Sequence, residues 1–266
     1  MTNTADAAAA VNASSDPSSV DSTGPALVFD HLSMTFPDGT HALDDVSFSV
    51  DRGEFVTVVG PSGCGKSTLL RIASGLATNT GGVCAVDQDS IGYVFQDATL
   101  FPWRTVRKTV ELLAELHGLS ESALAPRIDE ALELVNLDEH QAKYPKQLSG
   151  GMKMRASLAR SLVLEPDVFL FDEPFGALDE ITRERLNDEL LSLFRAKNFA
   201  GLFITHSIAE AVFLSTRVLV MSARPGRIVA DYEVPFEYPR QHEIRYLPEF
   251  AELSGKISED LRGAHP

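Results

Sequence analysis

A glycine-rich segment at residues 60–68 carries the residue types needed to hold a chain of phosphate groups. It reads GPSGCGKST and follows the apolar run Phe55–Val59. Glycines let successive backbone N–H groups turn toward phosphate oxygens, and a helix that starts there adds unpaired donors and its dipole. A lysine at the helix start reaches the terminal phosphates, and the next hydroxyl binds Mg²⁺. The spacing therefore predicts a phosphate-binding loop made of Gly60, Pro61, Ser62, Gly63, Cys64, Gly65, Lys66, Ser67 and Thr68.

Two adjacent carboxylates follow a second apolar run, Val168–Phe171. A continuous run of this kind is typical of a strand buried on both faces of a parallel sheet. Asp172 then stands at the carboxyl end of the strand, where α/β sheets place their ligands, and we expect it to hold Mg²⁺, usually through water. The side chain of Glu173 points elsewhere, so this residue is predicted to polarise the water that attacks the γ-phosphate.

Two more polar residues stand at the ends of apolar runs. His206 follows Leu202–Thr205 and precedes a predicted helix near Ile208, so it is placed to contact the γ-phosphate and orient Glu173. Gln96 ends the run 91–95 and offers an amide oxygen to Mg²⁺ or to the attacking water. Either residue alone would be read as structural. Together with the phosphate-binding loop, they predict hydrolysis of a nucleoside triphosphate.

A second anion-binding helix start occurs far along the chain. Residues 148–152 read LSGGM and precede a stretch rich in Arg, Ala and Leu. Serine is a favoured N-cap, and glycines expose the backbone N–H groups of the first turn. The residues predicted to contact an anion here are Ser149, Gly150 and Gly151.

The remaining pattern predicts an α/β protein with a helical insertion. Strands are expected over 26–36, 46–50, 55–59, 168–171, 202–205 and 218–221, and helices over 66–75, 181–197 and 248–261. Between these regions, apolar residues recur at helical spacing from Val106 to about Leu164. An alternation of strands and helices that is interrupted by an all-helical stretch favours one sheet domain carrying an insertion at about 97–165.

Composition limits the partners. The chain has 266 residues, 44% of them hydrophobic, and a formal net charge of −15. That charge would repel DNA phosphates and anionic lipid, so no nucleic acid is expected and any membrane attachment requires a protein partner. No apolar run approaches the roughly 20 residues of a membrane span, and the N-terminus does not read as a signal peptide. Cys64 and Cys84 give neither a disulfide framework nor metal-ligand spacing. These features predict a cytosolic protein.

The order of motifs resembles the ATP-binding subunits of ABC transporters, over about residues 26–230. That resemblance implies a P-loop NTPase with a RecA-like parallel-sheet core, a small antiparallel β subdomain and an inserted helical subdomain. It also implies a head-to-tail dimer of two copies that hydrolyse MgATP. In such a dimer, residues 149–151 act on the ATP of the other copy, and the GALD segment with Asp179 couples the two sites. Phe36 lies where the family stacks an aromatic ring on adenine, although an ordinary core phenylalanine is the alternative.

Finer features resemble the nitrate, sulfonate and taurine importers. They are the segments FQDATLFPWRTV (95–106), SARPGRIV (222–229) and PEFAELSGKISEDLR (248–262), together with Met152. The resemblance implies an ATPase at the cytoplasmic face of the membrane, held by two transmembrane permease subunits and served by an external solute-binding protein. In this branch the loop 101–103 lies in the cleft that receives the permease, while packing of Trp103 inside the helical subdomain is the alternative. Other possibilities are an importer of a vitamin precursor of the pyrimidine or riboflavin type, a soluble ABC ATPase, and a module that binds nucleotide without hydrolysis.

The expected organisation is a disordered tail at 1–24, an ABC ATPase domain at 25–235 and a C-terminal extension at 236–266. Two positions depart from the family pattern. The segment between Gly82 and Gln96 is about half a dozen residues short, which leaves adenine contacts less defined, and Ser207 replaces an aspartate while still able to cap the next helix.

Overall fold

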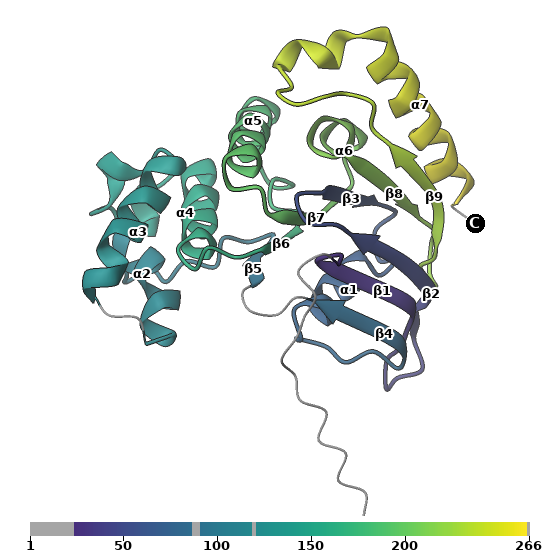
Figure 1. Cartoon of the computed structure of the whole chain (residues 1–266), viewed down its shortest axis with the longest axis horizontal. Coiled ribbons are helices and arrows are strands. Elements are labelled where there is room, and N and C mark those ends of the chain that lie inside the picture. The colour runs from purple at the N-terminus through teal and green to yellow at the C-terminus, as the bar shows by residue number, and fades with distance from the viewer. Residues whose placement is uncertain (1–23, 87–90, 119–120, 265–266) are drawn as a thin grey trace, which may run out of the picture.

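The computed structural model describes residues 24–86, 91–118 and 121–264. The tail expected to be disordered therefore lies outside the described residues except for Gly24, as do residues 87–90 of the segment 82–96, which we expect to be short. Two β-sheets form the body of the molecule, and a group of helices projects from one side of it (Figure 1).

The larger sheet has six strands in the order β5-β6-β7-β3-β8-β9. All neighbours pair in parallel except β8 and β9, which are antiparallel. Residues of β3, β6 and β7 are almost entirely buried, as expected for strands covered on both faces. The strands are β3 (Phe55–Val59), β5 (Ile91–Val94), β6 (Val168–Asp172), β7 (Ala200–Thr205), β8 (Arg217–Met221) and β9 (Ile228–Glu233).

The smaller sheet is antiparallel, with the order β2-β1-β4. Its strands are β1 (Leu27–Thr35), β2 (His41–Val50) and β4 (Gly81–Val86). Helix α1 (Lys66–Ala73) lies between this sheet and the larger one, because its apolar residues and alternate residues of β3 share one core with the inner face of the smaller sheet. Residues 82–86, at the start of the segment expected to be short, thus belong to the third strand of this sheet.

Three helices cover the other face of the larger sheet (Figure 1). They are α5 (Glu180–Lys197), α6 (Ile208–Leu214) and α7 (Pro248–Gly263), which is preceded by a 3-10 turn at His242–Tyr246. Phenylalanine rings from β3, β6 and β7 fill the space beneath them, with Phe55 in contact with Phe171 and Phe203. Fully burying such a side chain contributes about 1.5–3 kcal/mol.

The projecting helices lie between β5 and β6 in the chain. They are α2 (Val106–Leu116), α3 (Glu121–Leu134) and α4 (Gly150–Leu162), with 3-10 turns at Asp138–His140 and Pro145–Gln147. Thr105 and Ser149 are the N-caps of α2 and α4, and each side chain accepts a backbone N–H of the first turn. Ser149 therefore plays the capping role that its residue type predicts.

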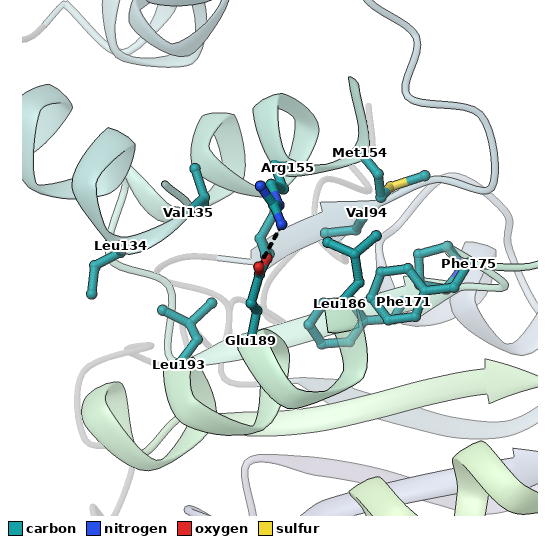
Figure 2. A pocket seen from close by; sticks show the side chains of 12 residues that line it. Val94, Leu134, Val135, Met154, Arg155, Phe171, Phe175, Leu186, Glu189 and Leu193 are labelled. Atoms are coloured by element: carbon teal, nitrogen blue, oxygen red, sulfur yellow. Dashed lines mark hydrogen bonds and ion pairs between the residues drawn. The ribbon is translucent and has the colours of Figure 1, made fainter. Parts of the chain in front are cut away.

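An apolar seam that contains an ion pair between α4 and α5 joins α4 to the body of the protein. Figure 2 shows Arg155 of α4 and Glu189 of α5 pointing toward one another, and a hydrogen bond connects their side chains. The surrounding side chains are apolar and come from both sides of the seam; they include Val94, Leu134, Val135, Met154, Phe171, Phe175, Leu186 and Leu193. This seam sets where the N-terminus of α4 lies relative to the larger sheet.

The predicted architecture is confirmed: a parallel core, a small antiparallel sheet and an inserted helical group. Strand β9 was not predicted, because its alternation of half-buried and exposed residues, typical of an antiparallel edge strand, leaves no continuous apolar run. Among the described residues, no helix combines the length and hydrophobicity required to cross a bilayer.

Candidate active site

The phosphate-binding loop connects β3 to α1 and depends on a glycine at its last position. Gly65 adopts φ +108°, and a Cβ there would lie 2.9 Å from the carbonyl oxygen of Ala42 and 2.6 Å from a methyl of Leu43. Only glycine fits such a position without strain. Gly65 is also the N-cap of α1 and has no side chain with which to cap it. The first-turn N–H groups of α1 are therefore left without a side-chain cap.

Lys66 is held inside this loop. Its side chain is only 5% exposed, and Nζ donates hydrogen bonds to the carbonyl oxygens of Gly60 (2.8 Å) and Pro61 (3.0 Å). Nζ also lies 3.8 Å from Glu173 Oε1. A buried ammonium requires partners of this kind, and phosphate oxygens could replace the carbonyls as acceptors.

Asp172, at the end of β6, is positioned by two hydroxyl groups. Ser67 Oγ donates to Oδ1 at 2.8 Å, and Tyr93 Oη donates to Oδ2 at 3.3 Å. The Tyr93 ring stacks on Phe95, and burial, reinforced by Asp172, raises the pKa of this phenol. Ser67 and Asp172 thus bring a hydroxyl and a carboxylate oxygen together, the hard donor set that Mg²⁺ prefers.

Glu173 and His206 meet at the ends of β6 and β7. Glu173 Oε2 lies 3.3 Å from His206 Nδ1, while the backbone N–H of Glu173 donates to the carbonyl oxygen of Ile204 at 3.0 Å. Glu173 has φ +46°, an uncommon conformation for a residue other than glycine that is concentrated at functional sites. The structure thus brings together Lys66, Ser67, Asp172, Glu173 and His206 at the carboxyl ends of three neighbouring parallel strands.

The other predicted site residues lie farther out. Gln96 is exposed, two residues beyond β5, and Phe36 is partly buried against the core of the smaller sheet. Asp179 is exposed and caps α5 by accepting the N–H of Thr182 at 3.0 Å, a hydrogen bond that lowers the pKa of its carboxyl group. At the start of α4, Ser149 and Gly150 are exposed and Gly151 is buried. In Figure 1, α4 stands apart from α1, so one copy of the chain does not bring the two helix starts together.

The sequence did not indicate that the loop containing Arg224 and Gly226 contacts the phosphate-binding loop. Arg224 donates from Nη2 (3.0 Å) and Nε (3.2 Å) to the carbonyl oxygen of Gly63. A Cβ on Gly226 would lie 2.2 Å from the carbonyl oxygen of Cys64, so the two loops are in close backbone contact. Residues 222–229 resemble the importer branch in sequence, but nothing local indicates which segment they contact. Tyr93 was missed for the same reason.

Comparison with known proteins identifies the family of the chain. A family model described as ABC transporter matches residues 43–176. The aliphatic sulfonates import ATP-binding protein SsuB of Bacillus cereus is 43% identical over 222 residues, which are 81% of this chain and 86% of that protein. The chain belongs to the ABC transporter family. It is an ATP-binding subunit, as its motif order predicted, and an ATPase of this family.

Solved structures extend the similarity to the whole ABC fold. CbiO1 of Clostridium perfringens, described as part of the ABC transporter complex CbiONQ, has a TM-score of 0.74 at 28% identity, covering 87% of this chain and 99% of that one. The ATP-binding cassette MJ0796 was solved as a dimer in a post-hydrolysis state with ADP and Pi. It has a TM-score of 0.70 at 29% identity, and the match covers 79% of this chain and 100% of that one.

Proposed function

We propose that this ABC ATPase energises uptake of a small anion of the nitrate, sulfonate or taurine class, with an aliphatic sulfonate favoured. The SsuB similarity supports the substrate class, and the coverage of nearly the whole relative supports the same role. In this proposal, two copies attach to two permease subunits at the cytoplasmic face of the membrane, and an external solute-binding protein delivers the anion.

The observation that carries the proposed ATP hydrolysis is the position of Glu173. Its carboxylate lies between Lys66 Nζ, 3.8 Å away, and His206 Nδ1, 3.3 Å away. A base at this point can accept a proton from water, while the ammonium stabilises the charge that develops on the transferred phosphoryl group. His206 orients the carboxylate. The role proposed for Lys66 is thus to bind the β- and γ-phosphates, and that of Glu173 is to activate the water.

The proposed metal site consists of the Ser67 hydroxyl, the Asp172 carboxylate and the Gln96 amide. Their oxygen donors fit Mg²⁺, which neutralises phosphate charge when it is bound with ATP. Ser67 Oγ and Asp172 Oδ1 are in hydrogen-bond contact, so the hydroxyl and the carboxylate lie side by side at this position. Gln96, which is exposed beyond β5, would complete the site.

The exposed start of α4 supports the proposed head-to-tail dimer. Ser149 and Gly150 present the start of a helix to solvent, and Asp179 caps α5 on an equally exposed loop. In the proposal, residues 149–151 of one copy bind the γ-phosphate held by the other copy, and Asp179 links the two sites. The dimeric form of MJ0796 is consistent with this arrangement.

An exposed aromatic pair supports attachment to a permease. Trp103 is 72% exposed and its ring contacts that of Phe101, which is 38% exposed. Trp103 is therefore not packed inside the helical subdomain. Exposed, clustered aromatic rings are typical of binding surfaces.

The proposal is tested by growth of a deletion strain on nitrate as sole nitrogen source, and on taurine or alkanesulfonates as sole sulfur source. We expect failure on the alkanesulfonates, restored by the intact gene and by a Lys256→Ala control on exposed α7, but not by Lys66→Ala. Failure on a different anion would reassign the substrate. Normal growth on all of them would contradict the anion assignment and favour a vitamin precursor, to be followed by isolation of the membrane partner.

A further inference from the structure

Two buried polar atoms behind the active site face one another without forming a hydrogen bond. Nε of Arg183, on α5, and Oε1 of Glu210, on α6, are both buried and have no hydrogen-bond partner among the described residues. The two atoms are 3.8 Å apart. Since buried polar groups are nearly always paired, two such atoms that face each other at this distance call for a physical explanation.

Glu210 is hydrogen-bonded to the residues on both sides of His206. Its Oε2 accepts a hydrogen bond from Thr205 Oγ1 (2.5 Å), and that hydroxyl accepts the N–H of Ser207 (3.0 Å). The N–H of Glu210 donates to Ser207 Oγ at 3.3 Å. Thr205 and Ser207 flank His206 in the chain, so Glu210 is linked by hydrogen bonds to both neighbours of His206.

Arg183 contacts the loop that leads into α5. Its Nη2 donates to the carbonyl oxygen of Leu178 at 2.9 Å, next to Asp179. The same guanidinium therefore bonds to the 176–179 loop on one side and faces the Glu210 carboxylate on the other. A relative movement on the order of 1 Å would bring Nε and Oε1 within hydrogen-bond distance.

We propose that Arg183 and Glu210 are positioning residues that link the 176–179 loop to His206 and so hold the imidazole against Glu173. This inference rests on the proposed roles of His206 and Glu173. When the loop moves toward α6, Arg183 and Glu210 come into hydrogen-bond contact. Glu210 then moves Thr205 and Ser207, to which it is bonded. The Arg183–Glu210 pair thus adds to the direct approach of Gly176, where a Cβ would lie 3.6 Å from the His206 ring, in setting the distance between His206 Nδ1 and Glu173 Oε2, now 3.3 Å.

Two conservative variants of the full chain test the link. Glu210→Gln keeps an oxygen for Thr205 but removes the charge that faces Arg183; Arg183→Lys keeps the charge but cannot bridge Leu178 and Glu210. We expect each to lower kcat for ATP hydrolysis about tenfold, a barrier change of about 1.4 kcal/mol, with KM for ATP within about twofold. The matched control is Glu54→Gln, because the partly buried carboxylate of Glu54 also faces an arginine, Arg217, but at the amino end of β3. It should leave kcat unchanged.

A double variant distinguishes a shared role from two independent ones. If the two side chains act as one unit, the double variant Glu210→Gln/Arg183→Lys has the same kcat as the less active of the two single variants. A loss of kcat of about a hundredfold in the double variant, the product of the two single losses, would overturn the proposal. An unchanged kcat in Glu210→Gln or an equal loss in Glu54→Gln would also overturn it. So would a loss of activity that is accompanied by a parallel fall in melting temperature and ATP affinity.

The variant His206→Ala tests the role of His206 separately from its link to Glu210. If it retains full activity, the proposed role of His206 fails. If it is inactive while Glu210→Gln is not, only the link fails.

Discussion

The chain contains two helix N-termini with similar chemistry and opposite surroundings. At the start of α1, Lys66 is 5% exposed and the loop before it is supported by Arg224. At the start of α4, Ser149 and Gly150 are exposed to solvent. The first helix lacks a side-chain cap, whereas the Ser149 hydroxyl accepts the N–H of Met152 at 3.3 Å.

Because of this difference, the site at α1 can bind an anion by itself, whereas the site at α4 cannot. A phosphate at α1 would meet uncapped N–H groups, a buried ammonium and a metal-ligand pair on several sides. A phosphate at α4 would meet one helix end, already capped and open to water, where each contact is worth little. The exposed terminus thus becomes effective only when a second surface excludes the water.

The largest effect is expected from Glu173→Gln, which leaves both helix termini intact. The amide cannot accept the proton from water, so phosphate release should fall by about 10²–10⁴, the typical contribution of a general base. ATP binding survives because Lys66 and Ser67 are unchanged, and an ATP-bound dimer should accumulate in size-exclusion chromatography. Glu252→Gln on exposed α7 is the control. Robust turnover by Glu173→Gln would show that another group activates the water.

Mixing two inactive variants tests whether the two termini belong to different copies. Lys66→Ala should abolish ATP binding, while Ser149→Glu should preserve binding by the monomer but repel the γ-phosphate of the other copy, and each should lower ATPase activity by about 10². In a mixed dimer one of the two sites is fully wild type, so a 1:1 mixture should recover roughly a quarter of the activity. If the mixture stays inactive while each variant folds, the two termini do not share a site between copies.

A matched pair of glycine substitutions compares the structural demands at the two termini. Gly65→Ala places a Cβ against the carbonyl oxygen of Ala42 at φ +108° and should cost roughly 1–3 kcal/mol of stability, together with loss of ATP affinity. At Gly150, the added Cβ would meet only a methyl of Leu178 at 3.0 Å, the end of a flexible side chain. Gly150→Ala should therefore leave the melting temperature and monomer ATP binding nearly unchanged. Equal destabilisation in thermal unfolding would contradict the contrast.

The features of the site that the sequence predicts are those that depend on interactions between residues close together in the chain. The phosphate-binding loop, the pair Asp172–Glu173, the capping role of Ser149 and the position of His206 depend on a strand, a turn and a helix that adjoin in the chain. Pattern and capping rules describe such units well. The parallel core was equally predictable, since its strands are continuous apolar runs.

The remaining contacts join residues that are far apart in the sequence. Tyr93 reaches Asp172 only because β5 and β6 are neighbours in the sheet, and Arg224 reaches Gly63 across 161 positions. The pairing of Arg183 with Glu210 likewise depends on how α5 and α6 pack on one face. None of these residues has a local signal that differs from that of an ordinary surface residue, so only the assembled fold reveals them.

The smallest expected effect concerns the seam that holds α4, and with it the exposed terminus, to the core. Burial raises the pKa of Glu189, although Arg155 and Arg185 oppose the shift. Below the unfolded value of 4.5 the group is protonated in both states. As the pH rises past that value, the unfolded chain ionises first, so the folded state loses stability until the pH exceeds the raised pKa.

Glu189→Gln removes this pH dependence, so the melting temperature of the variant minus that of wild type should increase between pH 4 and pH 7.5. The change should be small, since even 1 kcal/mol corresponds to only about 2–4 °C in a chain of this size. Glu252→Gln is the opposite control, since a hydrogen bond from Lys256 lowers the pKa of Glu252 and its contribution is lost on acidification. A difference for Glu189→Gln that shrinks with rising pH would mean that the attraction of Arg155 and Arg185 for the Glu189 carboxylate outweighs the effect of its burial.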